Sequence, residues 1–149
     1  MVYMDATLYK KAIEYSMINK RPKSIVLDLR GANLEYADFT GANLEGVNFK
    51  SAILKNIIFK DANLKNANFE GADLTEANLK GADLTNAYFG YAILEYADLY
   101  SADLTNSNFE FANLQYANLV NTNLTDVILL GASLSGAFVD IGDITRRVA

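Results

Sequence analysis

The chain has 149 residues, of which 51% are hydrophobic and 21% are charged, and its formal net charge is -5. This composition is typical of one folded domain and excludes a disordered chain. Cys, His and Trp are absent, which excludes disulfides, thiolate and imidazole metal sites, and the usual general base at neutral pH. We find no apolar run that could span a membrane and no signal-peptide pattern, so we expect a cytoplasmic protein that does not contact membranes.

Residues 1–26 carry no repeat and predict a short N-terminal α-helical cap. Asp5 is a suitable N-cap for a helix that runs to about Asn19, and Pro22 ends it. Two roles are open for this helix. It covers the first coil of the segment that follows, or it is an amphipathic helix that binds a partner.

Residues 27–145 repeat every five positions. Every fifth residue from Leu29 to Leu134, here called the centre, is Leu or Phe in all 22 quintets. The residue two before the centre is Ala in 16 quintets, and the residue just before it is Asn or Asp in 16. Five residues advance about 500° around an α-helix, and an odd period alternates between the two faces of a strand. The chain must therefore turn once per quintet with every centre pointing inward, as in a parallel β-helix.

The quintets Ala72–Glu76 (ADLTE) and Ala77–Gly81 (ANLKG) resemble the A(D/N)LXX motif of the pentapeptide-repeat proteins. The resemblance covers about residues 27–144 and implies an all-β solenoid, a right-handed quadrilateral parallel β-helix with four quintets per coil and about six coils. With a twenty-residue coil, the six Phe centres fall into only two columns, which are Phe49, Phe69, Phe89 and Phe109 in one and Phe39 and Phe59 in the other. Like residues then stack at the rung spacing of about 4.8 Å.

The repeat weakens after Leu134. Phe138, Val139, Ile141 and Ile144 follow the last regular quintet, and residues 146–149, which include Arg146 and Arg147, form a tail. This segment is too short for a substantial capping helix. The C-terminal coil is therefore either covered by its own residues or associates with a second copy as a homodimer, and both alternatives are open.

The sequence offers few residues for chemistry. Ser and Thr lack a His partner, and no Gly-rich phosphate loop is present. A twenty-residue coil places Asp83 one rung from Asp103, which is close enough to raise one pKa or to hold a cation weakly. Both residues, however, occupy the ordinary Asn/Asp position of the repeat. We therefore predict no enzyme activity, no cofactor and no metal site.

Four lysines follow successive centres through one complete coil, and they are Lys50, Lys55, Lys60 and Lys65. Such a ring suggests an anion site. A twenty-residue coil, however, places an acid one rung from three of them, with Glu70 beside Lys50, Glu35 beside Lys55 and Glu45 beside Lys65. We interpret the ring as ion pairs on a solvated surface, each worth little.

Outward aromatic residues predict a candidate partner surface. A twenty-residue coil stacks Tyr91 under Phe111 and Tyr96 under Tyr116, and the face between them carries Ile93 where the repeat has Asn or Asp. Tyrosine-rich clusters are common where proteins bind partners, whereas stacked rings also stabilise their own ladder. We call these five residues the aromatic surface. They favour a non-catalytic scaffold that binds an unidentified protein partner.

The charge is unevenly distributed along the chain. Residues 31–143 carry a net charge of -10, and no Lys or Arg stands between Lys80 and Arg146. The candidate acidic surface consists of Asp83, Glu95, Asp98, Asp103, Glu110 and Asp126. Together with Asp140 and Asp143 these acids place eight negative charges on about three coils, a density that approaches that of duplex DNA, about one charge per 1.7 Å. Direct nucleic-acid binding is disfavoured because no basic face exists.

The resemblance gives this acidic surface a second interpretation. Some pentapeptide-repeat proteins mimic duplex DNA in shape and charge, and protect or inhibit type II topoisomerase, the gyrase of bacteria. The alternative function is therefore a DNA-mimic modulator of gyrase that is linked to quinolone protection. This chain lacks the loop insertions and the C-terminal dimerisation helix of those proteins.

Overall fold

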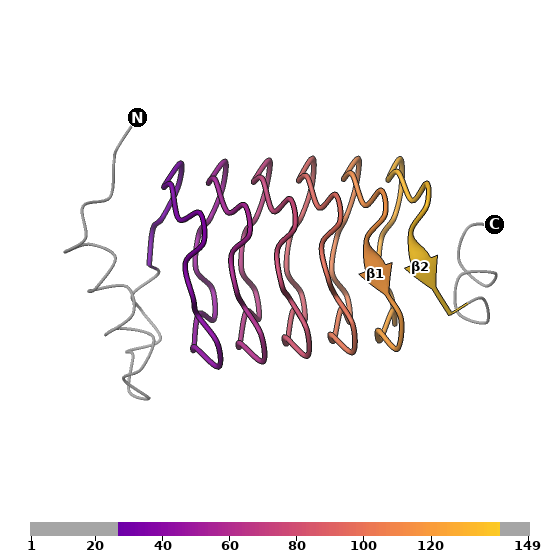
Figure 1. Ribbon diagram of the computed structural model, residues 1–149, viewed down its shortest axis with the longest axis horizontal. Coiled ribbons are helices and arrows are strands. Elements are labelled where there is room, and N and C mark those ends of the chain that lie inside the picture. Colours follow the sequence, from indigo (N-terminus) through magenta and orange to yellow (C-terminus); the bar gives the residue numbers. More distant parts are fainter. Residues whose placement is uncertain (1–26, 141–149) are drawn as a thin grey trace.

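The computed structural model describes residues 27–140, which form a rod of stacked coils (Figure 1). The predicted N-terminal helix and the residues Ile141, Ile144, Arg146 and Arg147 lie outside the described residues. The two named strands are β1 (Asn118–Leu119) and β2 (Phe138–Val139), which pair in parallel. Between residues 27 and 140, no helix is long and apolar enough to cross a membrane.

Single parallel bridges join each coil to the next. Every bridge connects a residue with the residue twenty positions later, as in the series Asn43, Asn63 and Asp83. The bridging residue is always the one just before a centre. The register therefore agrees with four quintets per coil, and the described chain is a β-solenoid.

Backbone hydrogen bonds run along the rod in both directions. In the quintet Ala72–Glu76, the N–H of Asp73 donates to the oxygen of Ala52 in the preceding coil, with N and O 3.0 Å apart. The N–H of Leu74 donates to the oxygen of Ile93 in the following coil at 2.7 Å. Two further N–H groups of the quintet also donate to backbone oxygens, so four of its five donors are satisfied by the backbone.

The Asn/Asp position of the repeat provides the fifth acceptor. The N–H of Thr75 donates to Oδ1 of Asp73 at 3.1 Å, and the N–H of Lys65 donates to Oδ1 of Asn63 at 3.2 Å. A side-chain oxygen that reaches the backbone two residues later is the usual contact of Asn and Asp in turns. This contact explains why Asn or Asp stands at the second position of the A(D/N)LXX motif. Ile93 stands at the Asn/Asp position of its quintet, and its side chain has no oxygen that could accept this hydrogen bond.

The residue two after each centre forms the corner of the coil. From Gly31 to Gly136, every corner residue has a φ between 55° and 72°. The next quintet's first N–H donates to the oxygen of the centre, as from Ala77 to Leu74 at 3.0 Å. A left-handed third residue with this bond is the pattern of a type II turn. Glycine adopts this conformation without strain, whereas other residues pay a conformational cost.

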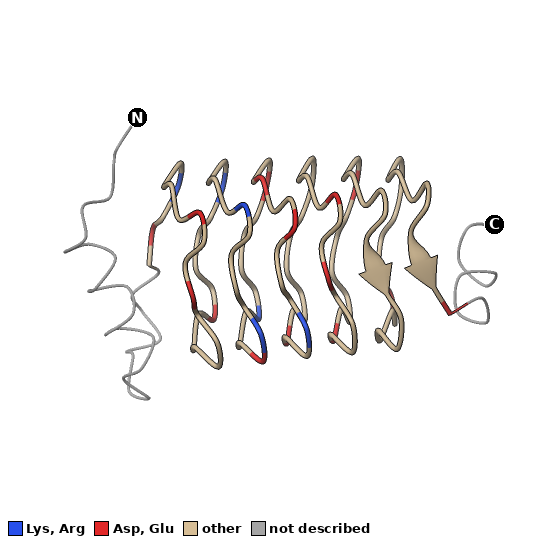
Figure 2. Ribbon diagram, viewed as in Figure 1, with Lys and Arg blue, Asp and Glu red and all other residues tan. Residues whose placement is uncertain are grey.

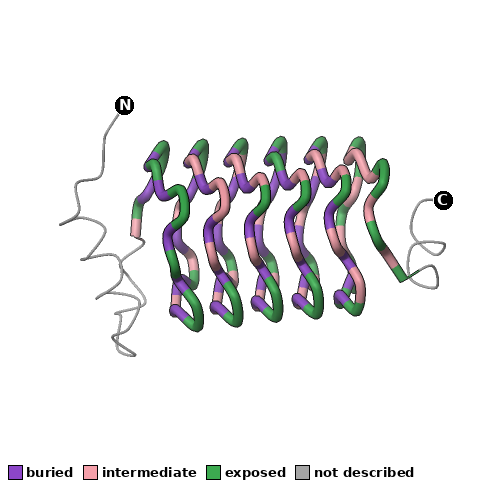
Figure 3. The backbone as a smooth tube through the Cα atoms, in the orientation of Figure 1, coloured by how far each residue is buried: buried purple, intermediate pink, exposed green. Residues whose placement is uncertain are grey.

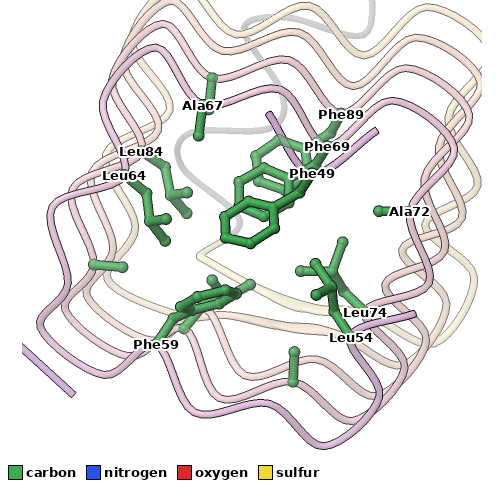
Figure 4. Packing of buried hydrophobic residues seen from close by; sticks show 14 of the residues in the cluster. Phe49, Leu54, Phe59, Leu64, Ala67, Phe69, Ala72, Leu74, Leu84 and Phe89 are labelled. Carbon is green, nitrogen blue, oxygen red and sulfur yellow. The ribbon is translucent and has the colours of Figure 1, made fainter. Parts of the chain in front are cut away.

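The centres and the alanines fill the interior (Figure 3). Leu84 and Phe89 are fully buried, and the predicted columns of Phe are confirmed. The ring centroids are 4.7 Å apart for Phe69 and Phe89 and 4.4 Å apart for Phe89 and Phe109. Figure 4 shows Phe49, Phe69 and Phe89 lying over one another between Leu and Ala side chains.

The interior becomes looser in the last described coil. Leu129, Leu134 and Val139 are only partly buried, whereas the equivalent centres of earlier coils are buried. A small apolar pocket opens here, lined by leucines together with Phe109 and Val127. The column of Phe ends at Phe109 and continues with the smaller Leu129, which leaves part of this space unfilled.

Candidate functional site

The aromatic surface consists of two short ladders of stacked rings. The ring centroids of Tyr91 and Phe111 are 5.2 Å apart, with 16° between the planes. Those of Tyr96 and Tyr116 are 5.0 Å apart, with 8° between the planes. Both stacks occur as the twenty-residue register predicts. Between 46% and 61% of each of the four residues is exposed, so the ladders are accessible from solvent.

Each ladder ends on a glycine of the last coil. A Cβ atom at Gly131 would lie 2.5 Å from the ring of Phe111, and a Cβ at Gly136 would lie 2.5 Å from the ring of Tyr116. The two rings therefore lie directly over these glycine backbones. Sequence reasoning missed the role of the glycines, although the register places each of them one rung after its ring.

The strip between the ladders is one face of the solenoid. Ile93 bridges to Asn113, and Asn113 bridges to Ser133. The side chain of Gln115 donates from Nε2 to Oγ of Ser133 at 3.1 Å. Ile93 is 39% exposed, so an apolar side chain interrupts an otherwise polar strip. The structure thus brings all five residues of the aromatic surface onto one face and its two corners.

The left-handed backbone at the four aromatic residues has a cost in conformational free energy. Tyr91, Tyr96, Phe111 and Tyr116 have φ values of 57° to 59°, and the left-handed conformation costs about 1 kcal/mol or more for each residue other than glycine. The four together cost about 4 kcal/mol relative to glycine by that measure, while two ring stacks return about 2 kcal/mol in addition to the apolar area that the rings bury. Stacking alone does not account for aromatic residues here. Most other corners hold Gly, Asn, Ser or Asp.

Ion pairs neutralise part of the candidate acidic surface. Nζ of Lys65 lies 3.0 Å from Oδ2 of Asp83, and Nζ of Lys80 lies 3.0 Å from Oδ2 of Asp98. Within residues 27–140, the other four members form no ion pair, and these are Glu95, Asp103, Glu110 and Asp126. Figure 2 shows the cations confined to the N-terminal coils, while acids continue along the rod.

The carboxylate of Asp83 is held in its ionised form. Partial burial raises the pKa of Asp83, but the hydroxyl of Thr85, 2.7 Å away, and the ammonium of Lys65 outweigh it. The pKa of Asp83 therefore lies below its ordinary value. Asp103 bridges to Asp83 as predicted, but the pair does not raise the pKa of Asp83. In the part of the chain described here, no group of three or more acids is placed to hold a metal ion.

The lysine ring forms ion pairs, and one of the predicted partners is wrong. Lys50 pairs with Glu70 at 2.7 Å, as expected. Lys55 pairs with Asp73 at 3.2 Å instead of Glu35. Lys65 pairs with Asp83 at 3.0 Å, and Asp83 and, more weakly, Glu45 raise the pKa of Lys65. The reason is geometric: a lysine after one centre reaches the Asn/Asp position of the next coil, where a threonine hydroxyl already fixes the carboxylate. Such exposed pairs contribute little stability.

Comparisons with known proteins agree with the repeat. The family model described as "Pentapeptide repeats" matches residues 28–66, 42–81, 59–90, 82–115 and 102–138. The chain is similar to the crystal structure of Rfr23, a pentapeptide repeat protein from the cyanobacterium Cyanothece 51142. The two are 28% identical with a TM-score of 0.65, over 76% of this chain and 88% of Rfr23. No curated protein matches the sequence.

Two further solved structures are similar over a shorter part of their own length. HetL from Nostoc sp. strain PCC 7120, described as involved in heterocyst differentiation regulation, is 34% identical with a TM-score of 0.55, over 74% of this chain and 56% of HetL. A pentapeptide repeat protein from the Arabidopsis thaliana thylakoid lumen is 33% identical with a TM-score of 0.52, over 73% of this chain and 62% of that protein.

Proposed function

This chain belongs to the pentapeptide-repeat family, and from that premise we propose that it is a non-catalytic scaffold that binds a protein partner through the aromatic surface. The scaffold is a right-handed quadrilateral β-helix of about six coils, with residues 1–26 as its helical cap. One observation carries the proposal: four exposed rings stand at corners where the left-handed backbone favours glycine. Rings that stand on a left-handed backbone and remain accessible favour a binding surface.

The rigidity of the solenoid supports this function. Each ring of the aromatic surface is attached to backbone that is hydrogen bonded to the adjacent coil, as from the N–H of Tyr96 to the oxygen of Gln115 at 3.0 Å. Little backbone freedom is then lost when a partner binds, which favours affinity. The description of HetL as involved in regulation is consistent with a binding role of this kind.

The test is capture of proteins from a lysate of the source organism. The double variant Tyr96→Ser and Tyr116→Ser removes one ladder. Tyr36→Ser is the matched control, because Tyr36 is an exposed corner tyrosine in the same column, three coils before Tyr96. We expect the double variant to lose partners that the wild type and the control retain. Unchanged capture of every partner by the double variant would contradict the proposal.

The acidic surface favours a second candidate, a DNA-mimic modulator of gyrase that is linked to quinolone protection. Residues 81–140 contain seven acids and no Lys or Arg. Two of the acids, Asp83 and Asp98, are neutralised by lysines. Five charges therefore remain over about 14 Å of rod, where duplex DNA carries about eight.

A supercoiling assay with purified gyrase, with and without a quinolone, tests this second candidate. If the second candidate is correct, the wild-type chain changes the activity of gyrase. This effect should be weaker in a variant in which four unpaired acids are neutralised by Glu95→Gln, Asp103→Asn, Glu110→Gln and Asp126→Asn. No effect of the wild-type chain at a large molar excess would remove the candidate.

The apolar centres of the C-terminal coil are relevant to the oligomeric state of the protein. We propose either a cover formed by the chain's own residues or a homodimer through this coil, because Leu129, Leu134 and Val139 are only partly buried. Exposed apolar centres are what either arrangement would cover. Light scattering coupled to size-exclusion chromatography separates the two, since only the second gives twice the mass of the chain, and a monomer at high concentration contradicts it.

A further inference from the structure

A glutamate stands immediately before a ring in each ladder of the aromatic surface. Glu95 precedes Tyr96, and Glu110 precedes Phe111. Both acids occupy the outward position after a centre and are half-buried. The N–H of Tyr91 donates to the backbone oxygen of Glu110 at 2.9 Å, so the backbone of Glu110 lies next to the corners that carry both rings of its ladder. Each ladder therefore has its own carboxylate.

Within residues 27–140, neither carboxylate forms an ion pair. Residues 81–140 contain no Lys or Arg, and the nearest lysines before them, Lys65 and Lys80, pair with Asp83 and Asp98. Asn108 donates from Nδ2 to Oε2 of Glu110 at 3.0 Å. That bond orients the carboxylate of Glu110 and leaves its negative charge uncompensated.

Apolar side chains continue the surface beyond the rings. Leu130 is 64% exposed and stands next to Gly131, on which the ring of Phe111 lies. The N–H of Phe111 donates to the oxygen of Leu130 at 2.9 Å, which places Leu130 one rung beyond Glu110. With Ile93, the accessible surface thus combines rings, aliphatic groups and two unpaired carboxylates.

From this arrangement, and resting on the proposed function, we infer that the aromatic surface binds an arginine-containing segment of a protein partner, with one arginine at each pair of glutamate and ring. A guanidinium group bonds a carboxylate through two parallel N–H donors while its plane stacks on an aromatic ring. Lysine offers only a compact charge and gains less from the ring. Nucleic acid and anionic lipid carry the same sign of charge as the surface and are repelled.

The experiment is selection of random twelve-residue peptides displayed on phage against the full chain, followed by fluorescence anisotropy with the selected peptides. We expect at least two arginines among apolar residues in the enriched peptides. The double variant Glu95→Gln and Glu110→Gln should bind them at least tenfold more weakly. Replacement of the peptide's arginines by lysine should weaken binding to the wild type at least threefold.

Matched controls separate local from general charge effects. Glu35→Gln with Asp126→Asn removes two charges elsewhere on the rod and should leave the affinity within twofold of wild type. Tyr36→Ser is the corresponding control for the aromatic variant Tyr96→Ser and Tyr116→Ser. If Glu35→Gln with Asp126→Asn weakened peptide binding as much as Glu95→Gln with Glu110→Gln, the peptides would be bound by the overall negative charge of the rod. That result would overturn the inference.

The remaining outcomes distinguish this inference from the function on which it rests. Peptides without arginine that lose binding in the aromatic variant overturn the arginine inference and leave the scaffold in place. Peptides that bind the aromatic variant as tightly as the wild type contradict the scaffold's use of this surface as well. If no peptide is enriched, the inference fails, and the lysate capture decides the proposed function by itself.

Discussion

The coils of residues 27–80 and those of residues 81–140 share one backbone and differ in what they present to solvent. Both halves have the same twenty-residue bridges and the same left-handed corners. The first half contains all the lysines of the solenoid, several of them in ion pairs. The second contains no cation, and its corners carry the two ring ladders.

This difference separates the residues that make the fold from those available for function. The centre, the alanine and the Asn/Asp residue of each quintet are used for the interior and the backbone. The two remaining positions face outward and vary in residue type, although the left-handed backbone of the corner position favours glycine.

The largest effect concerns the interior in the middle of the rod and in its last described coil. Leu84 is fully buried, so Leu84→Ala should lower the free energy of unfolding by about 2–5 kcal/mol. Leu134 is partly exposed and lines the apolar pocket, so Leu134→Ala should cost about 1 kcal/mol. Urea unfolding followed by circular dichroism measures both. Equal losses would show that the last coil is as tightly packed in solution as the middle of the rod.

Two glycines in one column compare the corners of the two halves. Gly71→Ala introduces a Cβ with its nearest atom 3.7 Å away, so only the left-handed backbone opposes it, at about 1 kcal/mol. Gly131→Ala places a Cβ 2.5 Å from the ring of Phe111, so the ring must move as well. We expect a loss of about 2 kcal/mol for Gly131→Ala and a changed near-ultraviolet dichroism that Gly71→Ala does not show. The same loss for both variants would contradict the stacking of the ring on Gly131.

Filling the pocket should make the last coil resemble the earlier ones. Leu129→Phe extends the column that ends at Phe109 into the space lined by Val127 and Leu134. We expect a gain of about 1 kcal/mol in the free energy of unfolding and a higher Tm, since filling a cavity stabilises a protein by about that much. A lower Tm would mean that the pocket closes in solution and that Phe overpacks it.

An ion pair between Lys65 and Asp83 links the two halves and makes stability depend on pH. Because the pKa of Asp83 is lowered in the folded state, its contribution is present above the unfolded pKa of about 3.9 and is lost as the pH falls through the folded value. Asp83→Asn should therefore reduce the difference in stability between pH 5 and pH 2, measured by urea unfolding at each pH. The same pH profile in Asp83→Asn and wild type would contradict this assignment.

The repeat predicted the fold well because its period is incompatible with a helix or a strand and leaves few alternatives. The stacks of Tyr91 with Phe111 and of Phe69 with Phe89 follow directly from the register. The ion pairs of Lys55 with Asp73 and of Lys65 with Asp83 did not follow, because rung distance alone does not describe how far a flexible lysine reaches toward an oriented Asp. The left-handed backbone under Tyr96 was equally hidden, since corners elsewhere hold Gly or Asn and nothing in a tyrosine indicates a positive φ.

The smallest expected effect compares a lone corner tyrosine of the first half with a stacked one of the second. Tyr36 and Tyr116 stand in one column with φ values of 62° and 59°, and Tyr116 alone of the two stacks on another ring. Tyr36→Gly should stabilise the chain by about 0.5 kcal/mol, because relief of the left-handed backbone exceeds the entropy that glycine adds to the unfolded chain. Tyr116→Gly should destabilise it by about 0.5 kcal/mol, because a stack worth about 1 kcal/mol is lost as well.

Thermal unfolding of the two glycine variants measures that difference, and its size decides why aromatic residues stand at these corners. One stack is shared by two left-handed corners, Tyr96 and Tyr116. A difference of about 1 kcal/mol or less would therefore offset only about half of the backbone cost of that ladder, and a partner would remain the reason for its rings. A loss of more than about 3 kcal/mol in Tyr116→Gly alone would make the ladder sufficient by itself, beyond the usual worth of a ring pair. The aromatic surface would then stabilise the last coils. The exposed rings at left-handed corners would have a structural explanation, and the proposed function would lose the observation on which it rests.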